Sequence, residues 1–181
     1  MKLLIASDIH GDYECAKKIC DIYKEEKCDK MLLLGDILYH GPRNDLPNGY
    51  APKSVIELLN SMDGEIIAVR GNCDTAVDQM VLSFPILADY ALLCIDGVTM
   101  FATHGHKFNA DTLPPLKKGD VLLHGHTHLV TVQSLGYDNY CINPGSTSIP
   151  RGNNIGSYMI FENRTFTIYD LDKNVLEVVK V

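Results

Sequence analysis

The middle of the chain reads Val121-Leu122-Leu123-His124-Gly125-His126-Thr127-His128, with alternating histidines directly after an apolar run. The apolar run is typical of the end of a buried strand, so the histidines follow where the strand leaves the sheet. Residues i and i+2 of an extended backbone point to the same side. We therefore expect His126 and His128 to direct two imidazoles at one point, as in a metal site. Taken alone, the pattern is also compatible with a histidine-rich turn that binds nothing.

The remaining histidines also follow strand-like runs. The chain has seven histidines, at positions 10, 40, 104, 106, 124, 126 and 128, and all but His40 lie in three short segments directly after an apolar run. His40 follows soon after a fourth such run. Histidines with only structural roles would be expected anywhere along the chain, so this placement favours one shared site.

Composition indicates one globular domain over residues 1–181. A chain of 181 residues can bury a full core, and its 46% hydrophobic and 22% charged residues are close to globular averages. The formal net charge is −7 and no dense cluster of lysine and arginine occurs, which argues against binding to duplex nucleic acid.

The start of the chain lacks a long apolar segment, because Asp8 soon interrupts the run from Leu3 to Ala6. A secretory signal or a membrane span needs a longer run. The six cysteines show neither zinc-ribbon spacing nor the framework of a short secreted protein. We expect a cytoplasmic protein without membrane association. The sequence leaves open whether it forms a homo-oligomer.

Hydrophobic periodicity divides the chain into an α/β half and a mostly β half. The first half predicts strands at 3–6, 31–34 and 65–69, and helices at 13–27, 53–62 and 76–84. The second half predicts strands at 90–95, 98–103, 121–123, 130–135, 140–143, 157–161, 165–170 and 175–181, with Asp96-Gly97 as a hairpin turn. This order favours an α/β fold of two packed sheets with helices outside.

Polar side chains suited to metal binding follow several of these strands. They are Asp8, His10, Asp36, Asn72, His104, His126 and His128. A strand-helix-strand unit makes the first two strands parallel, which places the Asp8 loop and Asp36 at the same edge of the sheet. Seven nitrogen and oxygen ligands are too many for one tetrahedral zinc and suit two ions that share a carboxylate.

As an ordered set, these motifs resemble the calcineurin-like metallophosphoesterase superfamily. They are Asp8-Ile9-His10, Gly35-Asp36, Gly71-Asn72-Cys73-Asp74, His104-Gly105-His106 and Gly125-His126-Thr127-His128. The resemblance implies a sandwich of two packed mixed β-sheets flanked by helices. It also implies a centre with two divalent ions, often manganese in the small bacterial members, although the ligand types also suit iron, zinc or nickel.

Carried over by motif, the resemblance assigns Asp8, His10 and His128 to one ion and Asn72, His104 and His126 to the other. Asp36 would bridge the two ions. The implied reaction is hydrolysis of small phosphodiesters by a hydroxide held between the ions, with no protein nucleophile.

One position departs from the pattern of the wider superfamily. Many members have histidine where this chain has Cys73, and use it to stabilise the transition state or to protonate the leaving group. A thiol is a poorer general acid near pH 7. His106 or His40 is a candidate to replace that function, and an equal alternative is that each only orients a ligand.

A long segment from Ile37 to Pro52 contains three prolines and two glycines and has no regular period. Because it leaves directly from Asp36, we expect it to form a wall of the substrate site. Arg43 is the candidate anion contact, and His40 and Cys73 are further candidate substrate contacts. The alternative is a solvated loop with an ordinary surface arginine.

Two other functions fit the same fold. One is a protein-interaction scaffold with vestigial metal binding, since fold alone does not establish catalysis. The other is a nuclease. The complete ligand set argues against the scaffold, and the acidic net charge argues against the nuclease.

Overall fold

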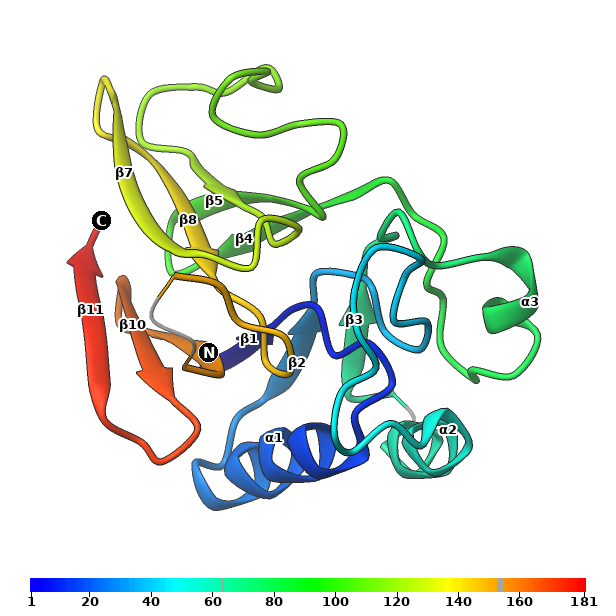
Figure 1. The fold of residues 1–181 in the computed structure, drawn as a ribbon. Helices are drawn as coiled ribbons and strands as arrows, with labels where there is room; N and C mark the ends of the chain where they lie inside the picture. Colours follow the sequence, from blue (N-terminus) through cyan, green and yellow to red (C-terminus); the bar gives the residue numbers. More distant parts are fainter. Residues whose placement is uncertain (63, 153–154) are drawn as a thin grey trace.

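The computed structural model describes residues 1–62, 64–152 and 155–181, which form two mixed β-sheets and helices (Figure 1). The larger sheet has the order β11 (Val175–Lys180), β10 (Thr165–Asp170), β9 (Ser157–Glu162), β1 (Leu3–Ala6), β2 (Lys30–Leu33), β3 (Ile66–Ala68). The smaller sheet has the order β4 (Tyr90–Ile95), β5 (Val98–Thr103), β6 (Val121–Leu123), β8 (Asn139–Pro144), β7 (Val130–Gly136). The helices are α1 (Tyr13–Glu25), α2 (Pro52–Asn60) and α3 (Ala76–Gln79).

Parallel pairs lie at the centre of the smaller sheet and at the β3 end of the larger sheet, and antiparallel pairs complete both sheets. β1 pairs with β2 and β2 with β3 in parallel, as predicted for the first strands, and β9, β10 and β11 continue the sheet in antiparallel fashion. In the smaller sheet, β6 pairs in parallel with β5 and β8. The strands β1, β2, β3, β5, β6 and β8 therefore supply the parallel carboxyl ends that surround the site.

Alternation along β1 and β2 separates two hydrophobic cores. Leu4 and Leu33 belong to a cluster with the buried faces of α1 and α2, which lie side by side along one face of the larger sheet (Figure 1). Leu3 and Leu32 belong to a second cluster, which includes residues of the smaller sheet such as Met100. Because side chains of a strand alternate between faces, β1 and β2 are buried on both sides, which explains their continuous apolar runs.

The outer face of the smaller sheet is covered by irregular chain instead of a helix. Phe101, Leu122 and Cys141 form a third buried cluster, and Phe108 and Leu116 of the segment between β5 and β6 pack against it. The predicted arrangement of two packed sheets is confirmed, with α1 and α2 covering only the larger sheet. In the described part of the chain, no helix has the length and apolar character needed to cross a membrane.

The predicted helix at 76–84 is wrong beyond residue 79. Thr75 and Asp78 form a capping box that starts α3, but the side chain of Gln79 then ends it. Its Nε2 donates hydrogen bonds to the carbonyls of Leu82 and Phe84, and its Oε1 accepts one from the backbone N–H of Ile86. These hydrogen bonds satisfy backbone groups of a non-helical turn, and this turn buries the side chains of Leu82 and Phe84. The other predicted boundaries differ by at most two residues, for example Lys30–Leu33 instead of 31–34.

Leu32→Ala tests the packing between the sheets. Leu32 is fully buried, so its truncation should lower the free energy of unfolding by about 2–5 kcal/mol. Leu92→Ala is the matched control, because Leu92 lies on a strand but is 59% exposed. Urea denaturation of both variants measures the difference. Equal losses in the two variants would contradict this packing.

Candidate metal centre

The predicted ligands lie beside one another at the carboxyl ends of the parallel strands. Asp8 and His10 follow β1, Asp36 follows β2, Asn72 follows β3, His104 follows β5, and His126 and His128 follow β6. Their loops are tied together by backbone hydrogen bonds. Asp8 N–H donates to the Gly35 carbonyl at 3.1 Å, and Gly125 N–H donates to the His104 carbonyl at 2.8 Å. The two sheets thus contribute to one centre.

The extended backbone predicted for the histidine motif is wrong. His126 and His128 have φ values of 65° and 62°, and Asp8, His10 and Asp36 are also in the left-handed region. Such conformations cost about 1–2 kcal/mol per residue that is not glycine, so the surrounding contacts must hold them. The side chains reach the centre because each loop turns sharply at its ligand. Strand alternation does not direct them.

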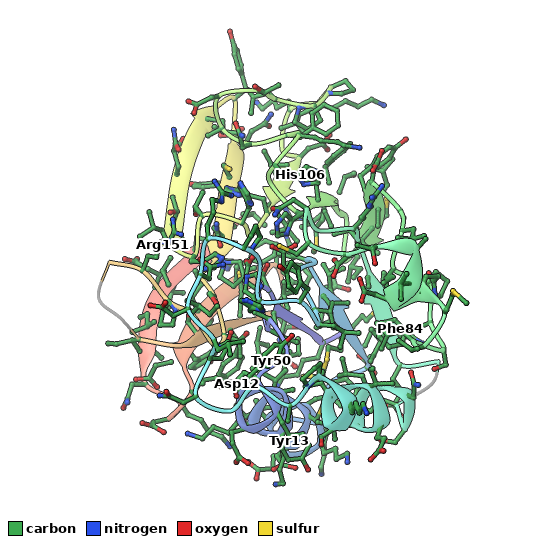
Figure 2. The ribbon with its side chains drawn as sticks, turned by 45° about the vertical axis from the view of Figure 1, so that its right-hand side comes forward. Asp12, Tyr13, Tyr50, Phe84, His106 and Arg151 are labelled. Carbon is green, nitrogen blue, oxygen red and sulfur yellow. The ribbon has the colours of Figure 1, made fainter. Side chains whose placement is uncertain are left out.

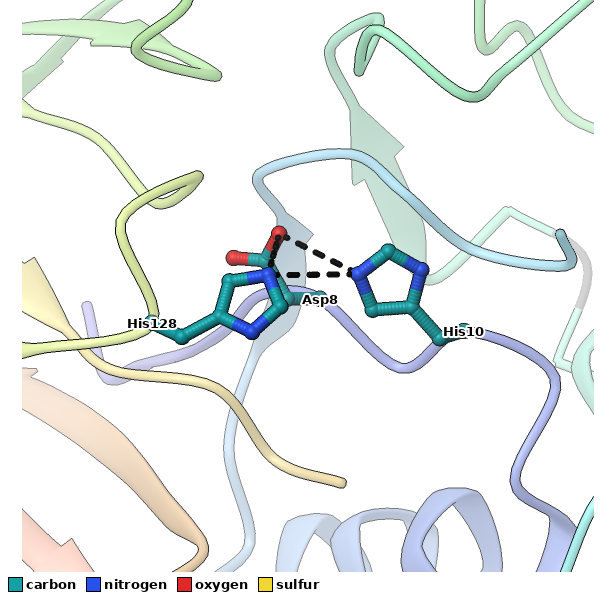
Figure 3. Close-up of side chains that lie close together, drawn as sticks. All are labelled: Asp8, His10 and His128. Carbon is teal, nitrogen blue, oxygen red and sulfur yellow. Dashed lines mark hydrogen bonds and ion pairs between the residues drawn. The ribbon is translucent and has the colours of Figure 1, made fainter. Parts of the chain in front are cut away.

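Asp8 is buried and its two carboxylate oxygens have different surroundings. Oδ2 accepts hydrogen bonds from Ser7 Oγ at 2.6 Å and from the backbone N–H of His126 at 2.9 Å. Oδ1 has no hydrogen-bond partner in the described residues, yet the Nε2 atoms of His128 and His10 lie 3.3 Å and 3.7 Å away (Figure 3). A buried carboxylate oxygen beside imidazole nitrogens is an arrangement suited to a divalent cation.

Backbone carbonyls orient three of the imidazoles toward this centre. The Nδ1 atoms of His10, His104 and His128 each lie 2.7 Å from a carbonyl oxygen. The acceptors are Tyr39, Leu34 and Ile149, respectively. A proton held on Nδ1 by a carbonyl leaves the lone pair on Nε2, which is the usual arrangement of metal-binding histidines.

Asp36 lies between the groups that contain His10 and His104. Its Oδ2 is 3.7 Å from His10 Nε2 and 3.4 Å from His104 Nε2, while its Oδ1 accepts a hydrogen bond from the backbone N–H of Cys73 at 2.8 Å. The position of Asp36 is therefore compatible with a carboxylate shared by two ions.

Asp74 holds the Asp36 loop in place, a role that the sequence reasoning missed. Its buried carboxylate accepts hydrogen bonds from the backbone N–H groups of Asp36, Ile37 and Gly71 at 2.8, 2.9 and 2.7 Å. Burial raises the pKa of Asp74, although these bonds oppose the shift. Its position directly after Asn72-Cys73 in the Gly-Asn-Cys-Asp motif is the sequence feature that could have indicated this role.

Asn72 and His126 lie beside His104, on the second side of the centre. Asn72 Oδ1 is 3.0 Å from His104 Nε2, and the rings of His104 and His126 have centroids 5.0 Å apart. Among the described residues, three clusters have candidate ligand atoms within 4.8 Å of one another: Asp8, His10 and His128; Asp8, Asp36 and His104; and His10, Asp36 and Cys73. His126 is in none of these clusters, although it lines the adjacent cavity.

The electrostatics of the cluster favour added positive charge. Burial raises the pKa of Asp8, but the imidazoles of His128 and His104 outweigh this effect and hold the pKa well below its usual range. Burial also raises the pKa of Asp36, and His104 again reverses the shift. The pKa of His104 is raised to about 9, because Asp36 and Asp8 outweigh its desolvation. Two ionised carboxylates thus lie at the centre.

Cys73 differs from these groups, because its environment stabilises the neutral form. The side chain is 8% exposed, and burial together with Asp36 raises the pKa of its thiol to about 12. Its Sγ lies within 4.8 Å of candidate ligand atoms of His10 and Asp36. A neutral thiol therefore adjoins the centre. This agrees with the expectation that Cys73 is a poor general acid.

A cavity of about 360 Å³ opens onto the centre. Its wall includes Asp36, Asn72, Cys73, His126 and His128, together with Arg43 of the long loop and Arg151. Arg151, labelled in Figure 2, was missed because it lies in a segment without regular period, and only the structure shows its backbone N–H bonded to the His128 carbonyl at 3.0 Å. The two arginines make the cavity suited to an anion.

His40 and His106 do not line this cavity. The His40 ring packs against the edges of Tyr39 and Tyr50, with centroids 4.7 Å and 5.4 Å away. The His106 ring lies 5.4 Å from that of His104, and its Nδ1 has no hydrogen-bond partner in the described residues (Figure 2). His106 is therefore near a predicted ligand, whereas His40 supports the loop.

Comparison with known proteins identifies relatives that span most or all of the chain. A family model described as the calcineurin-like phosphoesterase superfamily domain matches residues 1–165. Phosphodiesterase YfcE of Escherichia coli K12 is 43% identical over 100% of this chain and 98% of its own length. Phosphodiesterase MJ0936 of Methanocaldococcus jannaschii is 27% identical over 80% of this chain and 83% of its own length.

Solved structures show the same fold. YfcE, described as a phosphoesterase from E. coli, superimposes with a TM-score of 0.96 at 43% identity, covering 99% of this chain and 98% of its own. Vps29 of Chaetomium thermophilum superimposes with a TM-score of 0.64 at 16% identity, covering 100% of this chain and 97% of its own. The second likeness concerns the fold alone.

Gly125→Ala tests the packing behind Asp8. An added Cβ would collide with Ser7 Oγ and come within 2.6 Å of Asp8 Oδ2, so the carboxylate must shift. We expect the affinity for Mn²⁺, measured by calorimetry on metal-free protein, to fall roughly 10- to 100-fold.

Gly119→Ala is the control for this variant. Gly119 has a positive φ of 84° and open space around it, so alanine there strains the backbone without reaching the centre. Its Mn²⁺ affinity should equal that of the wild type. The same affinity loss in both variants would show that general destabilisation is responsible.

Proposed function

This chain belongs to the calcineurin-like phosphoesterase superfamily, and we propose that it is a phosphodiesterase that hydrolyses small diesters with two divalent metal ions. The observation that carries the proposal is the position of Asp36 Oδ2, 3.4 Å from His104 Nε2 and 3.7 Å from His10 Nε2. A carboxylate between two groups of nitrogen ligands is what a shared ligand requires. The 43% identity to phosphodiesterase YfcE supports the diester substrate.

The proposed ligand assignment follows the orientation of the side chains. Asp8, His10 and His128 hold one ion, Asn72, His104 and His126 hold the other, and Asp36 contacts both. The unpaired Oδ1 of Asp8 and the carbonyl-fixed imidazoles support this assignment. Nitrogen and oxygen ligands suit manganese, which we propose as the metal, and they also bind iron, zinc or nickel. When bound, such ions activate water and neutralise phosphate charge.

The cavity wall determines how an anionic substrate is held. Arg43 and Arg151 offer planar guanidinium groups that match phosphate oxygens, and Asp36 is the only carboxylate among the described lining residues. We assign both arginines to binding and orienting the diester.

The protein offers little help in protonating the leaving oxygen. With a pKa raised to about 12, the Cys73 thiol is a weak acid at neutral pH. His106 lies near His104 but outside the cavity lining. We therefore propose that the enzyme favours diesters whose leaving group departs readily as an anion, such as aryl esters.

Replacing Asp36 and Asn72 separately tests the shared ligand. Asp36→Asn should weaken Mn²⁺ binding at both positions, whereas Asn72→Ala should weaken mainly one. Calorimetric titration of each metal-free variant with Mn²⁺ measures binding at the two metal positions separately. Turnover of bis(p-nitrophenyl) phosphate should fall more than about 100-fold in Asp36→Asn. This loss exceeds the one typical of a residue that only hydrogen-bonds a metal ligand.

Selective loss of the same single ion in both variants would contradict a shared Asp36. A wild-type protein that binds two Mn²⁺ ions but turns over no diester would favour the scaffold function instead. Preference for DNA over small diesters would favour a nuclease.

Arg43→Ala tests the substrate role of the long loop. Removal of a charge-assisted hydrogen bond should lower kcat/KM for bis(p-nitrophenyl) phosphate roughly 10- to 100-fold while Mn²⁺ content stays unchanged. Arg164→Ala removes the same charge from an exposed arginine outside the cavity and should keep wild-type kinetics. Unchanged kinetics in Arg43→Ala would assign the arginine to the solvated surface.

A further inference from the structure

A second cavity of about 320 Å³ lies beside the metal centre and has a mainly apolar wall. Its apolar lining includes Leu38, Tyr39, Tyr50, Ile56, Val77 and Val81. These residues come from the long loop, from α2 and from the α3 region, so three separate segments build the cavity. Tyr50 is labelled in Figure 2.

The two cavities share the side chain of Cys73, which lines both. Its Sγ lies within 4.8 Å of the candidate ligand atoms of His10 and Asp36. Cys73 therefore lies where the second cavity meets the centre. A diester with its phosphorus at the centre has two ester groups, and one of them can extend past Cys73.

The second cavity differs from the first in its chemistry. The first contains Arg43 and Arg151, whereas the described lining of the second has no arginine. Its charged groups are Lys53 and Asp78, which have opposite signs. The Asp78 carboxylate is already engaged, because it accepts hydrogen bonds from Thr75 N–H at 2.7 Å and Thr75 Oγ1 at 2.8 Å. With one charge of each sign, the lining has no net charge and is mainly apolar, which favours an uncharged group.

Three of the apolar side chains of this wall are exposed to solvent in the protein. Val77 is 68% exposed, Val81 44% and Tyr39 41%. Grouped apolar exposure beside a polar centre is typical of a ligand site. The ring of Tyr50 is held against the His40 ring, with centroids 5.4 Å apart, which gives the cavity a fixed aromatic wall.

From this arrangement we propose that the second cavity is a specificity site that binds an uncharged apolar ester group, of the size of an aromatic ring. The rest of the diester then faces Arg43 and Arg151. The inference rests on the proposed function, since it requires a phosphodiester at the centre. It adds that the two sides of the substrate differ, one being apolar and the other polar or anionic.

Binding of two diesters tests the proposal without depending on which ester bond breaks, and phenol release is assayed in the same samples so that only titrations completed before cleavage are compared. Calorimetry on the Mn²⁺-loaded protein compares diphenyl phosphate with dimethyl phosphate. The wild type should bind diphenyl phosphate at least about tenfold more tightly, the effect of removing roughly 55 Å² of apolar surface from water.

The variant Val77→Ser/Val81→Ser makes the wall polar without touching a predicted ligand. It should reduce the preference for diphenyl phosphate about tenfold and leave the affinity for dimethyl phosphate unchanged. Met80→Ser is the matched control, because Met80 lies in the same segment, is 83% exposed and does not line the cavity. It should keep the wild-type preference.

Equal affinities for the two diesters in the wild type, or an unchanged preference in the double variant, would overturn the proposal. Absence of binding by either diester would overturn it as well. A wild-type dimer that dissociates in the double variant, with the preference intact, would assign the valines to self-association and overturn it too. Turnover of bis(p-nitrophenyl) phosphate by the same samples separates the two claims. A wild type with the preference but no turnover refutes the proposed function and leaves the apolar site standing.

Discussion

The structure depends on keeping two buried carboxylates ionised at one edge of the sheets. Asp8 is fully buried and Asp36 nearly so, and burial alone would raise the pKa of both groups. Imidazoles and backbone N–H groups reverse that shift. Ser7 and the His126 N–H both satisfy Asp8 Oδ2, and the Cys73 N–H satisfies Asp36 Oδ1; His126 and Cys73 come from loops that the fold must bring to the centre. Loops, strand order and histidine positions all serve this arrangement.

The close approach of the loops also explains why glycine stands at certain positions. A Cβ at Gly71 would collide with Asp36 Oδ1, and one at Gly125 would collide with Ser7 Oγ. Each glycine lets one loop lie directly against the carboxylate of another. The centre therefore combines left-handed ligand residues, which are strained, with glycines that remove steric obstacles. Strain of this kind is stable only because the parallel strands on either side are buried and rigid.

Much of the fold, and the meeting of the candidate ligands at one edge of the sheets, could be predicted because the signals are local. Apolar runs mark the strands, and Asp8, Asp36 and His104 follow such runs directly. The role of Asp74 depends on three backbone groups from two loops, and the place of Arg151 depends on its backbone bond to His128. The early end of α3 likewise depends on the side chain of Gln79 meeting chain beyond the helix. No local pattern contains these contacts, so the sequence alone could not reveal them.

Cys73 links the chemistry of the centre to the shape of the substrate site. The thiol is small, and it stands where the wall of the arginine-lined cavity meets the wall of the apolar cavity. It is also neutral, with a pKa raised to about 12 by burial and by Asp36. The bulkier histidine found here in many members of the superfamily would supply an acid but would occupy space at this boundary. With cysteine instead of histidine, the site has no strong proton donor here, and the two cavities remain adjacent. Under the proposed function, we therefore expect a preference for substrates whose leaving group needs no proton and whose apolar part can be bound beside the phosphate.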